Sequence, residues 1–339
     1  MAVSRTWIRR FAAMATIATF ALPARADVHE IGIAKQFGVA YLQLIVMEHE
    51  HLVSKHLREA GLPDVAVNWV TLSSGASVND ALLSGAVQFV PGGPAPFLTL
   101  WSKTRGNANT EVRGLCAMNS IPHYLNTRND AVRSVKDFTE QDRIALPAVK
   151  ASNQAVLLQM AAAKAFGGDE YAKLDHLTVS MSHPDAMAAL LSRAGGITSH
   201  FTAPPFQYTE LSKPGIHTVL TSYQVLGGPA SFNIIYATTK FHDANPRIVK
   251  AFIGALQEAT DFINKDKPRA AKIYVETEHS KISAQEVLKT ISDPQVNFTL
   301  VPQRVMRYAE FMHKVGTLKT VPASWHDLFF QEAAAFPGS

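Results

Sequence analysis

The chain lacks several features that would indicate a particular chemistry. Its 339 residues contain one cysteine, Cys116, which excludes an intramolecular disulfide and a multi-cysteine zinc site. No G-x-S-x-G sequence is present, so the motif of the serine hydrolase nucleophile elbow is missing. The sequence also lacks internal repeats and low-complexity segments. These absences favour an ordinary globular protein that does not depend on disulfides.

Long apolar runs are missing as well, and residues 1–26 resemble a secretory signal peptide. Three arginines in the first ten residues precede a run of about twelve mostly apolar residues, too short for the roughly 20 that span a bilayer. Ala24–Ala26 then provide the small-x-small pattern that signal peptidase reads. We expect cleavage after Ala26 and a periplasmic mature protein. The residues around the Arg9–Arg10 pair fit twin-arginine export poorly, so we favour the general secretory route.

Net charge of one sign is missing once these residues are removed. They contain four of the 32 lysines and arginines and no acidic residue, which leaves 28 basic and 28 acidic residues. A balanced charge without a basic stripe does not support binding to nucleic acid or charge-driven attachment to a membrane. No cysteine lies near the cleavage point, so we expect no lipid anchor there.

The sequence does contain alternating segments of strand and helix character. The expected strands in the first third are residues 30–34, 65–72 and 86–93, and the expected helices are residues 40–61, 73–85 and 94–103. This order predicts an α/β fold with a mainly parallel sheet and helices on both faces. The alternation starts again at residue 143 and ends in a long helical segment, residues 245–276.

The length predicts two lobes. About 313 residues after cleavage are many for a single hydrophobic core. No flexible linker interrupts the pattern, so strands must join the lobes. Ligands of open α/β sheets bind beyond the carboxyl ends of the strands, and we expect a ligand in the crevice between the lobes.

The segment MEHEHLVSKHLREAG, residues 47–61, raises the question of a metal site. On one continuous helix His49 and His56 are two turns apart, about 10 Å, which is too far for both to ligate one zinc ion. The H-E-x-x-H pattern also fails, because Val53 occupies the position of the second histidine. We therefore expect a helix with histidines at the edge of its buried face, and no metal.

Three strand-to-helix transitions carry amides, hydroxyls and small residues. They provide Gln36 and Phe37 in KQFG, Ser74 and Gly75 in SSGAS, and Ser152 and Asn153 in VKASNQ. A serine that caps a helix is common, so each transition alone indicates little. Together they predict backbone N–H groups and side chains that bind a small polar or anionic ligand.

Catalysis finds little support in the sequence. We expect Cys116 to be a buried, small apolar residue of a strand. Glu276, Glu278 and His279 lie in a polar stretch without an evident nucleophile. An enzyme remains an alternative, because catalytic groups need not be close in sequence.

Four segments in order resemble the substrate-binding proteins of bacterial ABC importers, in the nitrate/sulfonate/taurine (NMT1-like) group. The segments are residues 59–103, 132–167, 237–276 and 308–330. Two departures are visible: Gln88 replaces an acidic residue often found after the third strand, and residues 48–56 are rich in histidine. A related enzyme that makes the thiamine pyrimidine relies on a cysteine cluster, which this chain lacks.

The resemblance implies a type II periplasmic binding protein fold with two Rossmann-like lobes joined by two crossing strands. The first lobe would comprise residues 27–119 and 231–339, and the second residues 120–230. The implied cleft residues are Gln36, Phe37, Ser74, Gly75, Gly93, Ser152 and Asn153.

The implied function is capture of a solute and its delivery to ABC permease and ATPase subunits. We expect a monomer without catalytic residues, cofactor or metal. Sulfonates, nitrate-like anions, aromatic carboxylates and pyrimidines all stay open as ligands. A secreted enzyme on the same scaffold and a ligand-sensing partner of a membrane receptor are the alternatives.

Overall fold

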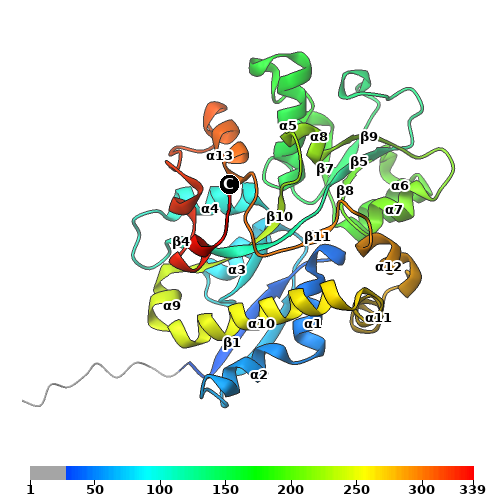
Figure 1. The fold of residues 1–339 in the computed structure, drawn as a ribbon. Helices are drawn as coiled ribbons and strands as arrows, with labels where there is room; N and C mark the ends of the chain where they lie inside the picture. Colours follow the sequence, from blue (N-terminus) through cyan, green and yellow to red (C-terminus); the bar gives the residue numbers. More distant parts are fainter. Residues whose placement is uncertain (1–27) are drawn as a thin grey trace, which may run out of the picture.

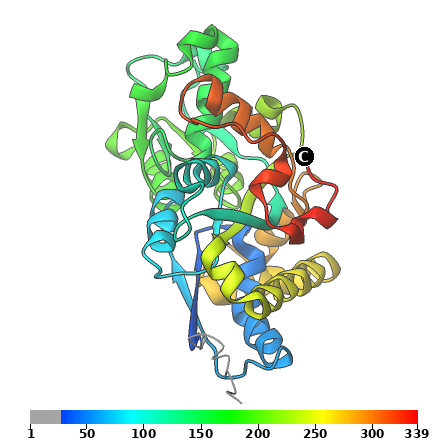
Figure 2. The same cartoon turned by 90° about the vertical axis from the view of Figure 1, so that its left-hand side faces the viewer.

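The computed structural model describes residues 28–339, so the predicted signal peptide and its cleavage point lie outside the described residues. Two α/β halves are visible in Figures 1 and 2, where the green segments lie above the blue and yellow ones. None of the helices within residues 28–339 is long and apolar enough to cross a membrane.

The first part of the chain forms β1 (Glu30–Lys35), η1 (Val39–Tyr41), α1 (Leu42–His49), α2 (Leu52–Glu59), β2 (Ala66–Thr71), α3 (Gly75–Leu83), β3 (Val90–Gly92), α4 (Pro94–Thr104) and β4 (Val112–Ser120). The middle part forms β5 (Tyr124–Thr127), η2 (Val135–Asp137), β6 (Ile144–Leu146), α5 (Asn153–Phe166), η3 (Gly168–Glu170), η4 (Asp175–Leu177), β7 (Thr178–Ser180), α6 (His183–Ser192), η5 (Ala194–Gly196), β8 (Ser199–Thr202), α7 (Phe206–Leu211), β9 (His217–Thr221) and α8 (Ser222–Leu226). The last part forms β10 (Ser231–Thr238), α9 (Thr239–Ala244), α10 (Pro246–Lys265), α11 (Lys267–Glu278), α12 (Ala284–Ile291), β11 (Asn297–Phe298), α13 (Val305–Lys314), η6 (Trp325–Leu328) and η7 (Gln331–Ala335).

The strands of the described chain form three sheets. Five strands in the order β7-β6-β8-β5-β9 form the sheet of the middle part, and four in the order β11-β4-β10-β3 form a second. Strands β1 and β2 pair in parallel, and a parallel bridge between Ile33 and Phe89 connects β1 to the segment before β3.

The prediction of a mainly parallel sheet is right for some pairs and wrong for others. β6 pairs in parallel with β7 and β8, as helical crossovers require. β10, in contrast, is antiparallel to both β3 and β4. The reason is that β4 leads from the first part of the chain into the middle part, whereas β10 leads back. The predicted lobe boundaries after residues 119 and 230 stay a prediction.

The expected continuous helix over residues 40–61 is wrong. It divides into η1, α1 and α2, and His51 has a left-handed backbone conformation with φ 51° and ψ 35°. The burial of the two helices explains the break, because α1 is buried on all sides from Leu42 to Met47, whereas α2 buries one face through Leu52, Val53 and Leu57. The break at His51 thus falls where the surroundings change from fully buried to half-exposed.

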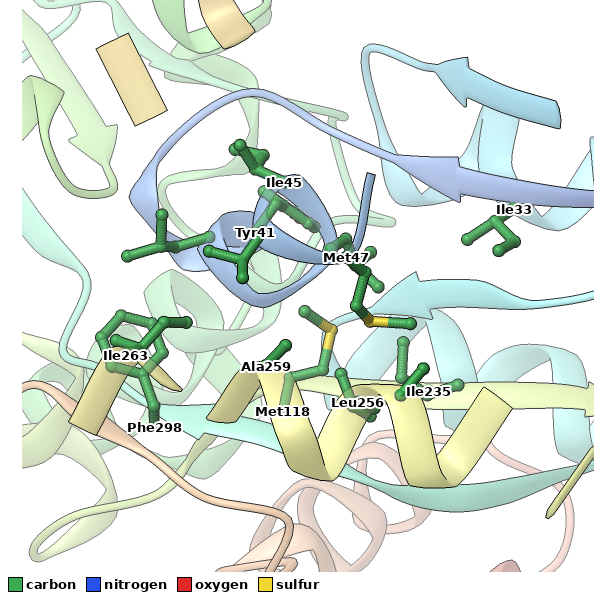
Figure 3. Close-up of a cluster of buried hydrophobic side chains, with 14 of the residues drawn as sticks. Ile33, Tyr41, Ile45, Met47, Met118, Ile235, Leu256, Ala259, Ile263 and Phe298 are labelled. Carbon is green, nitrogen blue, oxygen red and sulfur yellow. The ribbon is translucent and has the colours of Figure 1, made fainter. Parts of the chain in front are cut away.

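The core of the blue and yellow half lies between α1 and α10. Figure 3 shows Met47, Met118, Ile235, Leu256 and Ala259 converging between these helices and the strands β4 and β10. The rings of Phe89 and Phe252 stack at a centroid distance of 4.0 Å. A second cluster is continuous across both halves and includes Phe97 of α4, Leu157 of α5 and Tyr308 of α13. Packing of α4, α5 and α13 therefore fixes how the starts of α4 and α5 face each other.

Candidate functional site

A small cavity of about 40 Å³ lies where helix starts from both halves meet. Its lining residues are Gln36, Phe37, Tyr41, Ser73, Gly75, Gly93, Pro96, His123, Pro147, Ser152, Asn153, Gln154, His183, Phe232 and Asn233. A cavity needs about 10–15 Å³ to admit one water molecule, so this volume corresponds to about three water molecules. In this conformation the cavity therefore accommodates a group of a few atoms.

The structure brings six of the seven sequence-predicted residues to this cavity. Gln36, Phe37, Gly75, Gly93, Ser152 and Asn153 line it. Ser74 does not, and its neighbour Ser73 lies there instead. The Ser74 hydroxyl faces its own helix, where it accepts a hydrogen bond from the backbone N–H of Ser77 at 3.3 Å. That these residues bind a ligand stays a prediction.

The N-termini of four helices converge on the cavity. Gly75 begins α3, Gly93 is the N-cap of α4, Ser152 is the N-cap of α5 and His183 begins α6. The N-termini of α3, α5 and α6 present backbone N–H groups and the positive end of the helix dipole. The start of α4 has no N–H group to offer a ligand, because Pro94 and Pro96 lack one and the N–H of Ala95 donates to Asn153. The arrangement suits an anion or a strongly polar acceptor.

Glycine permits the close approach of these helix starts. A Cβ atom on Gly93 would lie 2.7 Å from Cγ of Asn153, and one on Gly75 would lie 2.9 Å from Cγ of Pro96. Both distances are shorter than real Cβ contacts, and Pro96 and Asn153 cannot easily move. The two glycines therefore set the width of the cavity.

Asn153 connects the two halves. Its Oδ1 accepts from the backbone N–H of Ala95 at 3.1 Å, and its Nδ2 donates to the hydroxyl of Tyr308 at 3.2 Å. Both polar atoms of the amide therefore already have partners in α4 and α13. The geometry assigns Asn153 a role in holding the helix starts together.

No lysine, arginine, aspartate or glutamate is among the cavity-lining residues of the described chain. Lys35 precedes Gln36, but its ammonium group bonds Glu278 at 2.6 Å and Glu48 at 2.7 Å. Burial alone would lower the pKa of Lys35, and the bonds to Glu278 and Glu48 outweigh burial and raise it. Lys35 thus ties β1 to α1 and α11, and the polarity of the cavity comes from helix starts, hydroxyls, amides and imidazoles.

Four cavity residues were not predicted from the sequence, namely His123, Tyr41, Phe232 and Asn233. His123 is buried, and its ring stacks on Phe232 at a centroid distance of 4.1 Å and an angle of 3°. Burial lowers the pKa of His123 to about 3, so the ring is neutral at pH 7. Tyr41 and Asn233 approach each other at 3.5 Å between Oη and Oδ1. These residues lie in a buried turn and in core strands or helices, where the local sequence gives no sign of a cavity.

His183 is the fourth helix start, and the sequence analysis also missed it. Its Nδ1 lies 2.9 Å from Nε2 of His200, and Nδ1 of His200 lies 2.6 Å from Oε1 of Glu210. Burial and the nearby His200 and His123 lower the pKa of His183 well below its usual value. The Ser-His-Pro sequence after β7 carries the same capping signal as two of the three predicted loops, because Ser182 caps α6 as Ser74 caps α3 and Ser152 caps α5.

Two of the three histidines of residues 47–61 lie against carboxylates near the surface. His49 approaches Glu50 at 3.0 Å, and Nε2 of His56 lies 2.7 Å from Glu258, which also bonds Lys55. Within residues 28–339 no group of three or more His, Cys, Asp or Glu side chains could hold a metal ion. Cys116 is fully buried in β4, as expected, and burial raises the pKa of its thiol.

Comparison with known proteins identifies the family and the fold. The NMT1-like family matches residues 26–277. No curated protein sequence matches the chain.

Solved structures of similar fold include two proteins that are named for different anions. The alkanesulfonate-binding protein SsuA from Xanthomonas axonopodis pv. citri, bound to MOPS, is 16% identical, with a TM-score of 0.68 over 88% of this chain and 96% of that chain. The periplasmic nitrate-binding protein NrtA from Synechocystis PCC 6803 is also 16% identical, with a TM-score of 0.71 over 90% of this chain and 87% of that chain. At this identity the likeness shows the fold, that of a periplasmic binding protein with two lobes.

Proposed function

Because the chain belongs to the NMT1-like family, we propose that it is the solute-binding component of an ABC import system. The observation that carries this proposal is the meeting of four helix N-termini, from both halves, around one cavity. A site made from two halves can close on a solute and open to release it. The expected location is the periplasm, after removal of residues 1–26.

The solute we propose is a small anion or the anionic head group of an organic molecule. A helix N-terminus stabilises a nearby anion by about 0.3–1 kcal/mol at exposed sites and up to about 2 kcal/mol when partly buried, and three helix starts at the cavity, those of α3, α5 and α6, can contribute in this way. Proteins of the same fold are named for binding an alkanesulfonate and nitrate. Sulfonate and nitrate-like groups are therefore the first candidates, and the cavity of about 40 Å³ favours a compact one.

Transport requires that the permease distinguish the loaded protein from the empty one. A solute that binds the closed form more tightly shifts the open–closed equilibrium toward it. We propose that ABC permease and ATPase subunits recognise this form, and that the binding protein acts as a monomer. A dissociation constant near 1 μM, about −8 kcal/mol, would permit both capture and release.

The alternative of a secreted enzyme has one feature in its favour, the His183–His200–Glu210 arrangement, because a carboxylate that orients an imidazole is also found in catalytic triads. However, Nε2 of His183 faces the side-chain amide of Gln154 at 3.2 Å. An amide is not a nucleophile, so this arrangement supplies no nucleophile–base pair. The chemistry at this position favours binding.

A thermal-shift screen tests the proposal. Sulfonates, nitrate, aromatic carboxylates and pyrimidines would each be added to the purified mature protein. A bound solute at 100 times its dissociation constant adds about 2.7 kcal/mol of stability, and we expect this for at least one sulfonate or nitrate-like anion. No stabilisation by any class would contradict the proposal. Mass spectrometry of the recovered solute distinguishes binding from catalysis, because an altered solute would support the enzyme.

A further inference from the structure

The three side chains of His183, His200 and Glu210, here called the imidazole relay, connect the cavity to the interior of the five-stranded sheet region. His183 lines the cavity, whereas His200 of β8 and Glu210 of α7 are both 0% exposed. Oε2 of Glu210 accepts from Nδ2 of Asn126 at 2.9 Å. The relay thus places one carboxylate out of contact with solvent, behind two imidazoles that separate it from the site.

The contacts fix where the hydrogens lie when both imidazoles are neutral. Because the Glu210 carboxylate accepts, Nδ1 of His200 carries a hydrogen and its Nε2 is an acceptor. Nδ1 of His183 then donates to that Nε2 over 2.9 Å, and Nε2 of His183 is left as an acceptor for the Gln154 amide N–H at 3.2 Å. All four side chains are satisfied in this form, and the relay carries one negative charge.

One added proton reverses the hydrogen bond between the two imidazoles. His200 becomes an imidazolium paired with Glu210, its Nε2–H donates to Nδ1 of His183, and Nε2 of His183 becomes a donor. The charge of the relay changes from minus one to zero. Nε2 of His183, in the wall of the cavity, changes from an acceptor to a donor. Gln154 can turn its amide so that its carbonyl oxygen accepts from this Nε2.

An anion in the cavity favours the second form over the first. A buried negative charge beside a bound anion is costly, because a low-dielectric interior does not screen like charges. We propose that the cavity binds its anion together with one proton, which the imidazole relay takes up from solvent; this inference rests on the proposed function. No covalent bond of the solute changes, and the proton returns to solvent when the solute leaves.

The surrounding groups disfavour an imidazolium at His183. His183 is faced by His200 from β8 and by His123 from the β4–β5 connection, and both act with burial to lower its pKa. Glu210 of α7 faces His200, α5 contributes the uncharged Gln154, and Asp185 of α6 is exposed and bonded to Ser182. The positive N-terminus of α6 also disfavours an imidazolium at His183. The proton that enters with an anion is therefore assigned to His200, beside the carboxylate of Glu210.

Nitrate and methanesulfonate are suitable probes, because both are fully ionised between pH 5 and pH 9 and any pH dependence of their binding belongs to the protein. A pH electrode in weakly buffered solution should record uptake approaching one proton per bound anion. Affinity should fall, by up to about tenfold per pH unit, as the pH rises, because the loaded protein binds one more proton than the free protein. Sulfonate buffers must be avoided, since they compete with the probe.

Glu210→Gln removes the buried negative charge and should abolish both the proton uptake and the pH dependence of affinity. His176→Gln is the matched control, because His176 also bonds a carboxylate, Glu140, at 2.8 Å, but lies exposed on the surface. It should behave as the unchanged protein does. The uptake measured on the unchanged protein decides the question even if Glu210→Gln fails to fold.

Binding without proton uptake would overturn this inference and leave the proposed function standing. Failure of both probes to bind would count against the nitrate and sulfonate assignment. In that case nitrogen-15 NMR of labelled histidines in the free protein still tests the relay. Hydrogens on Nδ1 of both His183 and His200, with bare Nε2 atoms at pH 7, would support it, and an imidazolium already present at either position would overturn it.

Discussion

Single buried imidazoles make the stability of the protein depend on pH. The pKa of His123 is about 3 in the folded protein because of burial, whereas an unfolded histidine has a pKa near 6.5. Between these values the unfolded chain binds a proton that the folded protein does not bind, so stability is complete above about pH 6.5 and falls as the pH decreases toward 3. The maximum slope for one such group is about 1.4 kcal/mol per pH unit.

His123→Phe should reduce this slope. Phenylalanine keeps a ring beside Phe232 and removes the titrating group. Urea unfolding at pH 5 and pH 6.5 should show a smaller loss of stability for the variant than for the unchanged protein, by up to about 1.4 kcal/mol per unit. The exposed His176→Gln again serves as the control. Identical slopes for His123→Phe and the unchanged protein would contradict the assignment of a buried neutral imidazole.

At this scale the sequence predicted the loop residues better than it predicted the histidines. Gln36, Gly75 and Ser152 follow strands and precede helices, and such positions can be read locally. His123 and His200 stand in buried segments, and a lone histidine in an apolar stretch is indistinguishable from an ordinary core residue. Only tertiary packing places His200 beside His183 of α6 and His123 beside Phe232 of β10, and packing is not a local property of sequence.

At the scale of the element, the division between α1 and α2 depends on His51. A non-glycine residue in the left-handed region costs roughly 1–2 kcal/mol of folding stability. Glycine avoids this cost, but its greater freedom in the unfolded chain offsets part of the gain. His51→Gly should therefore raise the free energy of unfolding by about 0.5 kcal/mol. Arg58→Gly, at an exposed position inside α2, should lower it by about 1 kcal/mol. Equal destabilisation by both, measured by urea unfolding, would indicate one continuous helix.

The break shows why a helix predicted from periodicity was too long. Apolar residues recur at helical spacing throughout residues 42–57, and that spacing says nothing about which element covers each face. α1 packs against both α10 and α11, whereas α2 packs against α10. The neighbours are distant in sequence, so the turn at His51 could not be predicted from the segment itself.

Two N-cap serines separate helix stability from solute binding. Ser152 and Ser74 each accept a hydrogen bond from a backbone N–H of the helix they begin, but only Ser152 lines the cavity. Each change to alanine should cost about 1 kcal/mol of stability. Ser152→Ala should also weaken binding of the best solute by about tenfold, as expected for a lost hydrogen bond to a charged group, and Ser74→Ala should leave affinity within about twofold. Calorimetric titration measures both, and unchanged affinity in Ser152→Ala would refute the site.

At the scale of the whole molecule, hydrogen bonds between residues that do not line the cavity also join the two predicted lobes, and one of them involves Tyr208. The hydroxyl of Tyr208, in α7, donates to Oδ2 of Asp293, just after α12, at 2.9 Å. If closure forms this bond, Tyr208→Phe should weaken solute affinity about fivefold, the equivalent of about 1 kcal/mol. Tyr171→Phe is a suitable control, because it also removes a tyrosine hydroxyl but keeps the ring, which is the part of Tyr171 that packs edge-on against Phe311. Equal affinities of the two variants in calorimetric titration would show that the bond does not favour the closed form.

The two-lobed α/β architecture was predictable from sequence because strand and helix segments alternate twice. The antiparallel relation of β4 and β10 was not, since Val112–Ser120 and Ser231–Thr238 are separated by the entire middle part of the chain. This pairing determines how the halves face each other. It therefore also determines that helix starts of α3, α4, α5 and α6 meet at one place.

The most direct test of the account is a crystal structure of the mature protein with the solute that stabilises it most. We predict the intact solute between the two halves, with its anionic group among the starts of α3, α5 and α6, near Gly75, Ser152 and His183. Solute at another place on the protein, or a chemically altered solute in the cavity, would contradict the account.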